Sequence, residues 1–196
     1  VLGLGNIGAA AGLPVMEGKC ALFKEFGGVE AFPICLDSED PEEVIRAVEM
    51  LAPQFGGINL EDIRSPECFE IERRLEEKLD IPVFHDDQHG TAIIVTAALL
   101  NALKVVGKQL KDVKIVHNGP GAAGTAIIKM LQTAGATDIT AVDEHGILYP
   151  GRPAGLADHK EWLAGVTNPR HLTGGLAEAV KGADVFIGTS VANVLT

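Results

Sequence analysis

Residues 113–143 constrain the fold most, because an apolar run, a glycine-rich turn, a helix-like run and a second apolar run follow at short spacing. We expect strands at 113–116 and 138–142 and a helix at 125–134. The three glycines of the turn let the backbone approach a phosphate at the helix N-terminus. This pattern predicts a βαβ unit that binds a dinucleotide, with the candidate contacts Asn118, Gly119, Pro120, Gly121, Ala122, Ala123 and Gly124.

Asp143 stands at the end of the second expected strand, about 20 residues after the last glycine of the turn. An acid at this place accepts hydrogen bonds from the adenosine ribose hydroxyls and repels a 2′-phosphate. We therefore expect NAD to be favoured over NADP as the cofactor. Pro120 weakens the same turn, since proline has no N–H to donate to a phosphate oxygen.

Two pairs of adjacent acids each follow an expected strand. Glu61 and Asp62 come after the apolar run at 57–60, and Asp86 and Asp87 come after the next one. Neighbouring carboxylates beside a hydrophobic core are costly unless a cation or hydrogen-bond donors compensate them. Oxygen ligands from two loops suit Mg²⁺ or Mn²⁺, which keep open positions for a substrate. The four acids therefore predict one site for a hard divalent cation.

Two other interpretations explain less. One of Asp86 and Asp87 could cap a helix that begins near Gly90, but a cap uses a single carboxylate. Zinc is the weaker metal, because the chain has no HExxH motif and no CxxC pair. We expect neither a disulfide framework nor a thiolate metal site, but buried reduced thiols at Cys20, Cys35 and Cys68.

Charge and hydropathy narrow the classes of partner. The net charge of -11 opposes binding to nucleic acid or to an anionic membrane, because phosphate groups would be repelled. No apolar run approaches the roughly 18 residues of a membrane span, and no signal peptide is visible. We expect a cytoplasmic protein that binds neither nucleic acid nor membranes.

Four motifs carry a resemblance to a known family, and they occur in that family's order: Gly3-Leu4-Gly5-Asn6-Ile7-Gly8, Leu13-Pro14-Val15-Met16-Glu17-Gly18-Lys19, Asn59-Leu60-Glu61-Asp62 and Phe84-His85-Asp86-Asp87-Gln88-His89-Gly90-Thr91. Together they resemble the middle of a bacterial-type malic enzyme, over essentially the whole chain. Four motifs in register are far harder to meet by chance than a lone glycine-rich turn. Two residues depart from the family's pattern: an alanine is usual in place of Pro120, and an aliphatic residue is common in place of His117.

The resemblance implies a reaction and residues for it. The reaction is the oxidative decarboxylation of (S)-malate to pyruvate and carbon dioxide, with reduction of NAD or NADP and dependence on Mg²⁺ or Mn²⁺. Lys19 matches the base that takes the proton from the malate hydroxyl, and Asp86 matches the acid that supports it. A lysine can serve as a base where burial and a nearby cation favour its neutral amine. Glu61, Asp62 and Asp87 match the metal ligands, and Thr91 is assigned to cofactor binding.

The expected fold is α/β, with two domains. A metal- and substrate-binding α/β domain at 1–106 is followed by a Rossmann-like NAD(P)-binding domain at 107–196. Beyond the βαβ unit we expect helices at 14–26, 41–52, 65–79, 91–106 and 172–182 and strands at 31–36, 57–60 and 81–84, with a strand and turn at 184–190. The helix at 65–79 is amphipathic, and its charged residues are expected on a solvated face.

Both domains are expected to be truncated at the chain ends. Val1 opens inside an expected strand, and Thr196 follows an apolar strand with no closing element. The resemblance places the family's tyrosine acid before Val1 and its substrate-binding asparagines after Thr196. We expect this fragment alone to be inactive and the full protein to be a homo-oligomeric enzyme, dimeric or larger.

Two further functions stay open at the level of sequence. Another Rossmann-type dehydrogenase, for instance one acting on amino acids, would leave the two acidic pairs unexplained. A non-catalytic NAD-binding or assembly module would fit the truncated ends and the proline in the turn. Dependence of activity on Mn²⁺ or Mg²⁺ separates these functions from a malic enzyme.

Overall fold

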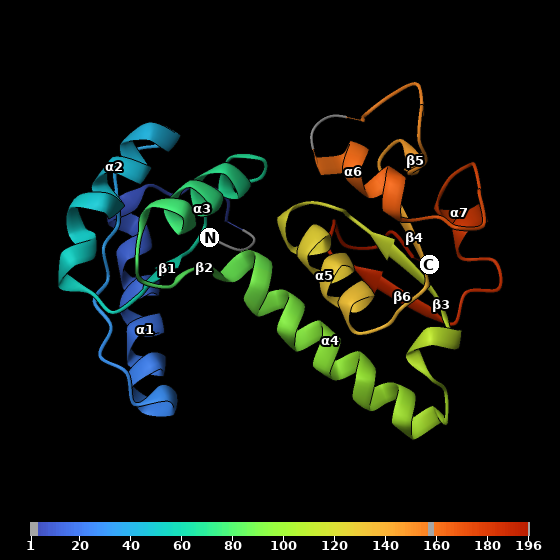
Figure 1. Cartoon of the computed structure of the whole chain (residues 1–196), viewed down its shortest axis with the longest axis horizontal. Coiled ribbons are helices and arrows are strands. Elements are labelled where there is room, and N and C mark those ends of the chain that lie inside the picture. The colour runs from blue at the N-terminus through green and yellow to red at the C-terminus, as the bar shows by residue number, and fades with distance from the viewer. Residues whose placement is uncertain (1–3, 157–158, 196) are drawn as a thin grey trace.

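A computed structural model describes residues 4–156 and 159–195 and shows two lobes connected by a long helix (Figure 1). The mixed α/β architecture confirms the predicted fold class. The strand expected to include Val1 lies outside the described residues.

The first lobe contains, over the described residues, three α-helices, one 3₁₀ helix and a two-stranded parallel sheet. Its elements are α1 (Ala9–Gly27), α2 (Pro41–Leu51), the 3₁₀ helix η1 (Ala52–Gln54), β1 (Ile58–Leu60), α3 (Glu67–Lys78) and β2 (Val83–His85). Helix α2 begins as its sequence predicts, because the Asp40 side chain accepts a hydrogen bond from the Glu42 amide and Pro41 takes the first helical position. Aliphatic side chains of α2, α3 and both strands form the core of this lobe.

The second lobe is a four-stranded sheet with the order β5-β4-β3-β6. Its elements are α4 (Asp86–Val106), η2 (Leu110–Asp112), β3 (Lys114–Asn118), α5 (Ala122–Thr133), β4 (Asp138–Asp143), β5 (Gly146–Ile147), α6 (His159–Val166), α7 (Leu176–Ala179) and β6 (Val185–Gly188). Strand β3 pairs in parallel with β4 and β6, and β5 turns back antiparallel at the edge. The predicted β3-α5-β4 unit is therefore confirmed, with helix α5 covering the sheet (Figure 1).

Helix α4 runs from the end of β2 to the second lobe (Figure 1). Its buried residues Ala92, Leu99 and Leu103 share a hydrophobic core with α5, β3 and β4. By this packing α4 belongs with the second lobe, although the expected division between residues 106 and 107 assigns it to the first domain. That division, as a limit between separate domains, stays a prediction.

By length and composition alone, α4 is apolar enough to cross a membrane, contrary to the expectation that no segment of the chain is. The core helix of a soluble protein passes the same test, so this is weak evidence. Two aspartates begin the helix, and one of its faces is packed in the core described above. The absence of a membrane partner stays a prediction.

Four expected elements differ from the structure. Helix α1 begins at Ala9, so Pro14 lies inside it and not at its start. Pro14 removes one backbone hydrogen bond of the helix, but the alanines before it favour helix strongly enough to outweigh that loss. Residues 31–36 are not a strand, because no neighbouring segment pairs with them. Helix α7 is much shorter than the expected 172–182, and Gly174 before it has a left-handed backbone. Helix α4 begins at Asp86, so neither acid there is its cap; the cap residue is His85.

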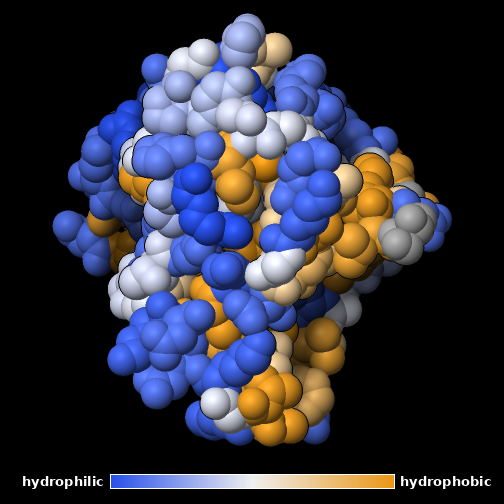
Figure 2. All heavy atoms as spheres, turned by 90° about the vertical axis from the view of Figure 1, so that its right-hand side faces the viewer, coloured by the Kyte–Doolittle hydropathy of each residue, from blue (hydrophilic) through white to orange (hydrophobic). Residues whose placement is uncertain are grey.

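Large apolar side chains also lie on the surface. On the face shown in Figure 2, hydrophobic patches interrupt a mostly hydrophilic surface. Over the described residues, exposed examples on α1 and α4 include Leu22, Phe26, Ile94, Val105 and Val106. Such residues are compatible with the predicted homo-oligomer, which stays a prediction.

Candidate active site and metal centre

The parallel pairing of β1 and β2 brings the two acidic pairs together. Leu60 lies opposite His85 in the register, so the residues after each strand emerge at the same edge of the sheet. Carboxylate oxygens of Glu61, Asp62 and Asp87 lie within 4.8 Å of one another. The three residues predicted as metal ligands are therefore adjacent.

Lys19 reaches this cluster from helix α1. Its Nζ donates to Asp86 Oδ2 at 2.6 Å and to Asn59 Oδ1 at 3.2 Å, and it also pairs with Glu61. Its side chain is only 20% exposed, so it is not the plain solvent-facing lysine that helix position alone would suggest. The structure thus joins the two predicted catalytic residues in one ion pair.

A cavity of about 360 Å³ adjoins these groups and is lined by Glu61, Asp86, Asp87, Gly90, Thr91, Ile94 and Val95. Gly90 faces the Asp86 carboxylate across one helical turn, and a Cβ at Gly90 would overlap that carboxylate. The absence of a side chain at Gly90 therefore lets Asp86 lie over the helix toward Lys19. Thr91, predicted to bind the cofactor, lines this cavity.

Asp87 is held from two sides. Its Oδ2 accepts a hydrogen bond from the Asp62 amide at 2.8 Å, and the buried His85 ring places Nε2 at 3.3 Å from the same oxygen. Burial works to raise the pKa of Asp87, but these two partners outweigh it, with a smaller contribution from the charge of Lys19, so the pKa lies below its usual value. The carboxylate is therefore ionised and fixed in direction near neutral pH.

The donor set fits a hard divalent cation. Three carboxylates from two adjacent strand ends supply oxygen ligands, and the adjoining cavity leaves room for a substrate.

The cysteines are all free; Cys68 is buried as predicted, but Cys20 and Cys35 are only half-buried. Burial raises the pKa of the Cys68 thiol to about 12, so it stays protonated and unreactive.

The glycine-rich turn has the geometry that its sequence predicts. Gly119 has φ +97°, and a Cβ there would collide with Ser190 beyond β6. A Cβ at Gly124 would overlap the carbonyl oxygen of Gly119 and the His117 ring. Helix α5 can therefore begin directly against the turn, with its N-terminal amides available to an anion.

Other predicted turn residues already have partners. Asn118 is buried, and its side-chain Nδ2 donates a hydrogen bond to Ser190 Oγ at 2.6 Å, which connects β3 to the segment after β6. The Pro120 carbonyl lies 2.9 Å from His159 Nε2. The His159 ring packs against Phe69 of α3 with a 5.0 Å centroid distance. The first lobe thus contacts the side of the second lobe that carries the dinucleotide turn.

His117 is fully buried on β3 beneath this turn, and among the residues that the structure describes neither ring nitrogen has a hydrogen-bond partner. Burial lowers the pKa of His117 from 6.5 to about 4. The imidazole is therefore neutral in the folded protein at neutral pH.

His117 should make the protein acid-sensitive. Below pH 6.5 the unfolded chain binds a proton at His117 that the folded chain does not bind. The free energy of unfolding therefore falls as pH falls from about 6.5 to about 4, by at most about 3.4 kcal/mol. Urea unfolding at pH 7.5 and pH 5 measures this loss. His117→Val should reduce the difference between the two pH values, and an unchanged difference would contradict the assignment.

Asp143 ends β4 beside the turn, as predicted, but its carboxylate is fully engaged. Oδ1 accepts from Arg152 Nη1 at 2.7 Å and the His145 amide at 2.8 Å, while Oδ2 accepts from Arg152 Nη2 at 2.8 Å and Lys160 Nζ at 2.9 Å. Burial opposes ionisation, yet Arg152, Lys160 and the His145 amide together lower the pKa of Asp143 to about 2. A ribose hydroxyl would have to displace one of these donors.

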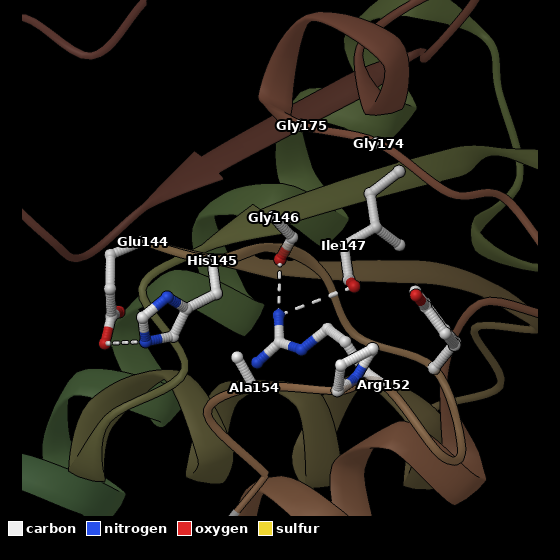
Figure 3. Close-up of a pocket in the computed structure, with 10 residues that line it drawn as sticks. Glu144, His145, Gly146, Ile147, Arg152, Ala154, Gly174 and Gly175 are labelled. Atoms are coloured by element: carbon white, nitrogen blue, oxygen red, sulfur yellow. Dashed lines mark hydrogen bonds and ion pairs between the residues drawn. The ribbon is translucent and has the colours of Figure 1, made fainter.

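Arg152 also donates to the carbonyl oxygens of Gly146, at 2.9 Å, and of Ile147, at 3.5 Å (Figure 3). It lines a second cavity, of about 400 Å³, at the sheet edge next to Asp143. The Asp143 carboxylate pairs with two cationic side chains, those of Arg152 and Lys160. A 2′-phosphate bound nearby would therefore be repelled less than the sequence alone predicts.

Comparison with known proteins agrees with this arrangement. A model of the malic enzyme NAD-binding domain matches residues 88–195, and a model of the malic enzyme N-terminal domain matches residues 1–40 and 38–76. The chain belongs to the malic enzyme family. The resemblance seen in the four motifs is confirmed.

Individual malic enzymes are similar over the full chain. The NAD-dependent malic enzyme of Geobacillus stearothermophilus is 57% identical, with all of this chain and 41% of that protein covered. The NADP-dependent malic enzyme of Escherichia coli is 51% identical, with 26% of that protein covered. A crystal structure of the NAD-dependent malic enzyme of Thermotoga maritima matches with TM-score 0.96 and 53% identity, over all of this chain and 52% of that one. The chain thus spans between about a quarter and about half of the length of these malic enzymes.

Proposed function

We propose that the protein containing this chain oxidatively decarboxylates malate to pyruvate and carbon dioxide, with NAD(P) as hydride acceptor and Mg²⁺ or Mn²⁺ as cofactor. The observation that carries the proposal is the Lys19–Asp86 ion pair beside three carboxylates at the edge of one cavity. Membership of the malic enzyme family, with relatives named as NAD- and NADP-dependent enzymes, supports it.

Each group has a task in this proposal. Glu61, Asp62 and Asp87 would hold the divalent cation, which supplies positive charge that stabilises negative charge developing on substrate oxygens. The Lys19 amine takes the proton of the malate C2 hydroxyl as hydride leaves C2 for the nicotinamide. Asp86 and Asn59 fix the Lys19 Nζ through their hydrogen bonds, which holds the amine beside two of the carboxylates that line the cavity. Gly121 and the N-terminus of α5 would bind the pyrophosphate.

The test uses the full-length protein, because the chain spans only part of its relatives. Purified protein with malate, NAD and Mn²⁺ is expected to form pyruvate, carbon dioxide and NADH in equal amounts, and chelation of the metal should stop the reaction. Metal-independent oxidation of another substrate would favour a Rossmann-type dehydrogenase of different specificity. NAD binding without any turnover would favour a non-catalytic module.

The choice between NAD and NADP depends on Lys160 as well as on Asp143. The NAD preference stays our prediction, but the two cations at Asp143 offset the repulsion on which it was based. We expect Lys160 to pair with a 2′-phosphate when NADP is bound, because its ammonium is partly exposed at the ribose end of the site.

Lys160→Gln is therefore expected to raise the KM for NADP about tenfold, the size of one charge-assisted hydrogen bond. The KM for NAD should stay within about twofold, because NAD has no phosphate at this place. Lys181→Gln serves as the matched control, since Lys181 is 77% exposed at the end of α7. Equal losses for the two cofactors would contradict the role of Lys160.

A further inference from the structure

A buried carboxylate on helix α3 is not explained by the active-site residues described so far. Glu72 is only 6% exposed and lies among Cys68, Ile71 and Leu75, on the side of α3 that faces the core. Burying a carboxylate costs free energy unless hydrogen bonds and charges compensate it. The other glutamates of α3 that pair with arginines of the same helix are about half exposed or more.

Glu72 accepts three hydrogen bonds from one short segment. Oε1 accepts from the His85 amide at 2.8 Å and from His89 Nε2 at 2.8 Å, while Oε2 accepts from the Gln88 side chain at 2.9 Å. Gln88 and the His85 ring are themselves buried. Burial alone would raise the pKa of Glu72, but the bonds from His89 and His85 outweigh it and lower the pKa.

These three donors lie on either side of Asp86 and Asp87 in the chain. His85 immediately precedes Asp86, and Gln88 immediately follows Asp87. His85 also contributes its ring, at 3.3 Å from Asp87 Oδ2. Glu72 therefore holds the backbone just before Asp86 and two side chains just after Asp87.

We propose that Glu72 is a positioning residue, which holds the β2–α4 junction so that Asp87 faces Glu61 and Asp62 while Asp86 faces Lys19. This inference rests on the proposed metal-dependent function. A metal site gains affinity when its ligands are held in the bound geometry before the ion arrives, and hydrogen-bond partners behind the ligands supply that order. Without Glu72, the acids would remain present, but the ligand set would be less ordered.

The experiment measures Mn²⁺ affinity of the full-length protein by the paramagnetic resonance signal of free Mn²⁺. Glu72→Gln keeps the side-chain shape but replaces an acceptor oxygen with a donor group. Glu72→Asp keeps the charge but shortens the reach. Both are expected to weaken Mn²⁺ binding about tenfold or more, the lower end of losses seen for residues that orient metal ligands. Glu77→Gln is the control, because it removes the same charge from a 60% exposed position on α3.

Two further readouts separate positioning from a general loss of structure. NADH affinity should change less than about twofold, and excess Mn²⁺ should restore most of kcat in Glu72→Gln, since the ligands themselves are intact. His89→Asn, which removes one of the three donors at a half-exposed residue, should weaken Mn²⁺ binding by a smaller factor even where Glu72 variants fold poorly.

The outcomes are distinct. Native Mn²⁺ affinity in Glu72→Asp would show that charge and not position matters, and equal losses of Mn²⁺ and NADH affinity in folded variants would show a structural role only; either result overturns the inference. If the unmodified protein binds no Mn²⁺, the proposed function itself fails. If the unmodified protein binds Mn²⁺ and His89→Asn binds it equally well, only the role of the Glu72 network is refuted.

Discussion

Replacing Lys19 with arginine is expected to lower kcat for malate oxidation by about a hundredfold or more, the size of a general acid–base contribution. The reason is chemical: a guanidinium stays protonated, so it can donate hydrogen bonds but cannot take the proton of the malate hydroxyl. Lys19→Ala should lose at least as much, since it removes both the base and the cation.

The structure makes this test sharp, because arginine could keep the ion pairs. Lys19 contacts two carboxylates, of Asp86 and Glu61. If Lys19 served only to neutralise them, arginine would retain most of the activity. Lys19→Arg with near-native kcat would therefore return Lys19 to a structural role and remove the base from the proposed mechanism.

A matched control lies on the same helix. Lys24 is 60% exposed and pairs with Glu30, away from the acidic cluster. Lys24→Arg should leave kcat unchanged, and Mn²⁺ and NADH affinities of Lys19→Arg should change far less than its kcat. A loss of all three properties in Lys19→Arg would indicate that the substitution disturbs the site as a whole.

Local patterns predicted the elements whose signals lie in adjacent residues. Helix α2 follows from Pro41 and the acids of its first turn, Glu42 and Glu43, and the β3-α5-β4 unit follows from its glycines and apolar runs. The error at residues 31–36 has a different source, because a strand exists only where a partner is available and the sequence does not show pairing. The start of α4 at Asp86 was not predicted, because the polar residues Asp86, Asp87 and His89 were interpreted as a loop before the helix.

The cluster of acids was predictable because acids at the ends of neighbouring parallel strands meet at one edge of the sheet. The partners of Asp143 were not predictable from the sequence. Arg152 comes from an irregular segment and Lys160 from α6, and only the tertiary structure shows that both pack against the end of β4. Glu72 was missed for a related reason. The charges of its helix were expected on a solvated face, and only the packing of α3 on β2 shows that one of them is buried.

The second large effect concerns the cation site: Asp87→Asn in the full-length protein is expected to abolish metal-dependent turnover at ordinary Mn²⁺ concentrations. Asp87 is a predicted ligand whose direction is fixed by the Asp62 amide and the His85 ring. An amide keeps the shape and one acceptor oxygen but removes the negative charge that attracts the cation. Glu61→Gln should have a similar effect, because Glu61 is a predicted ligand that also pairs with Lys19.

The measurement compares the dependence of malate oxidation on Mn²⁺ with direct Mn²⁺ binding in the same variants. Asp184→Asn is the control, since Asp184 is bound to Lys108 and the Lys114 amide at the far end of β3. Near-native activity of Asp87→Asn at saturating Mn²⁺, with native Mn²⁺ affinity, would remove Asp87 from the ligand set. Loss of activity with unchanged Mn²⁺ affinity would instead assign Asp87 to substrate orientation. We expect Asp87→Asn to lose both malate oxidation and Mn²⁺ affinity while NADH binding is retained. This result would mean that the Asp87 carboxylate binds the cation directly, because the dinucleotide turn is built from β3 and α5 and shares no residue with the acidic cluster.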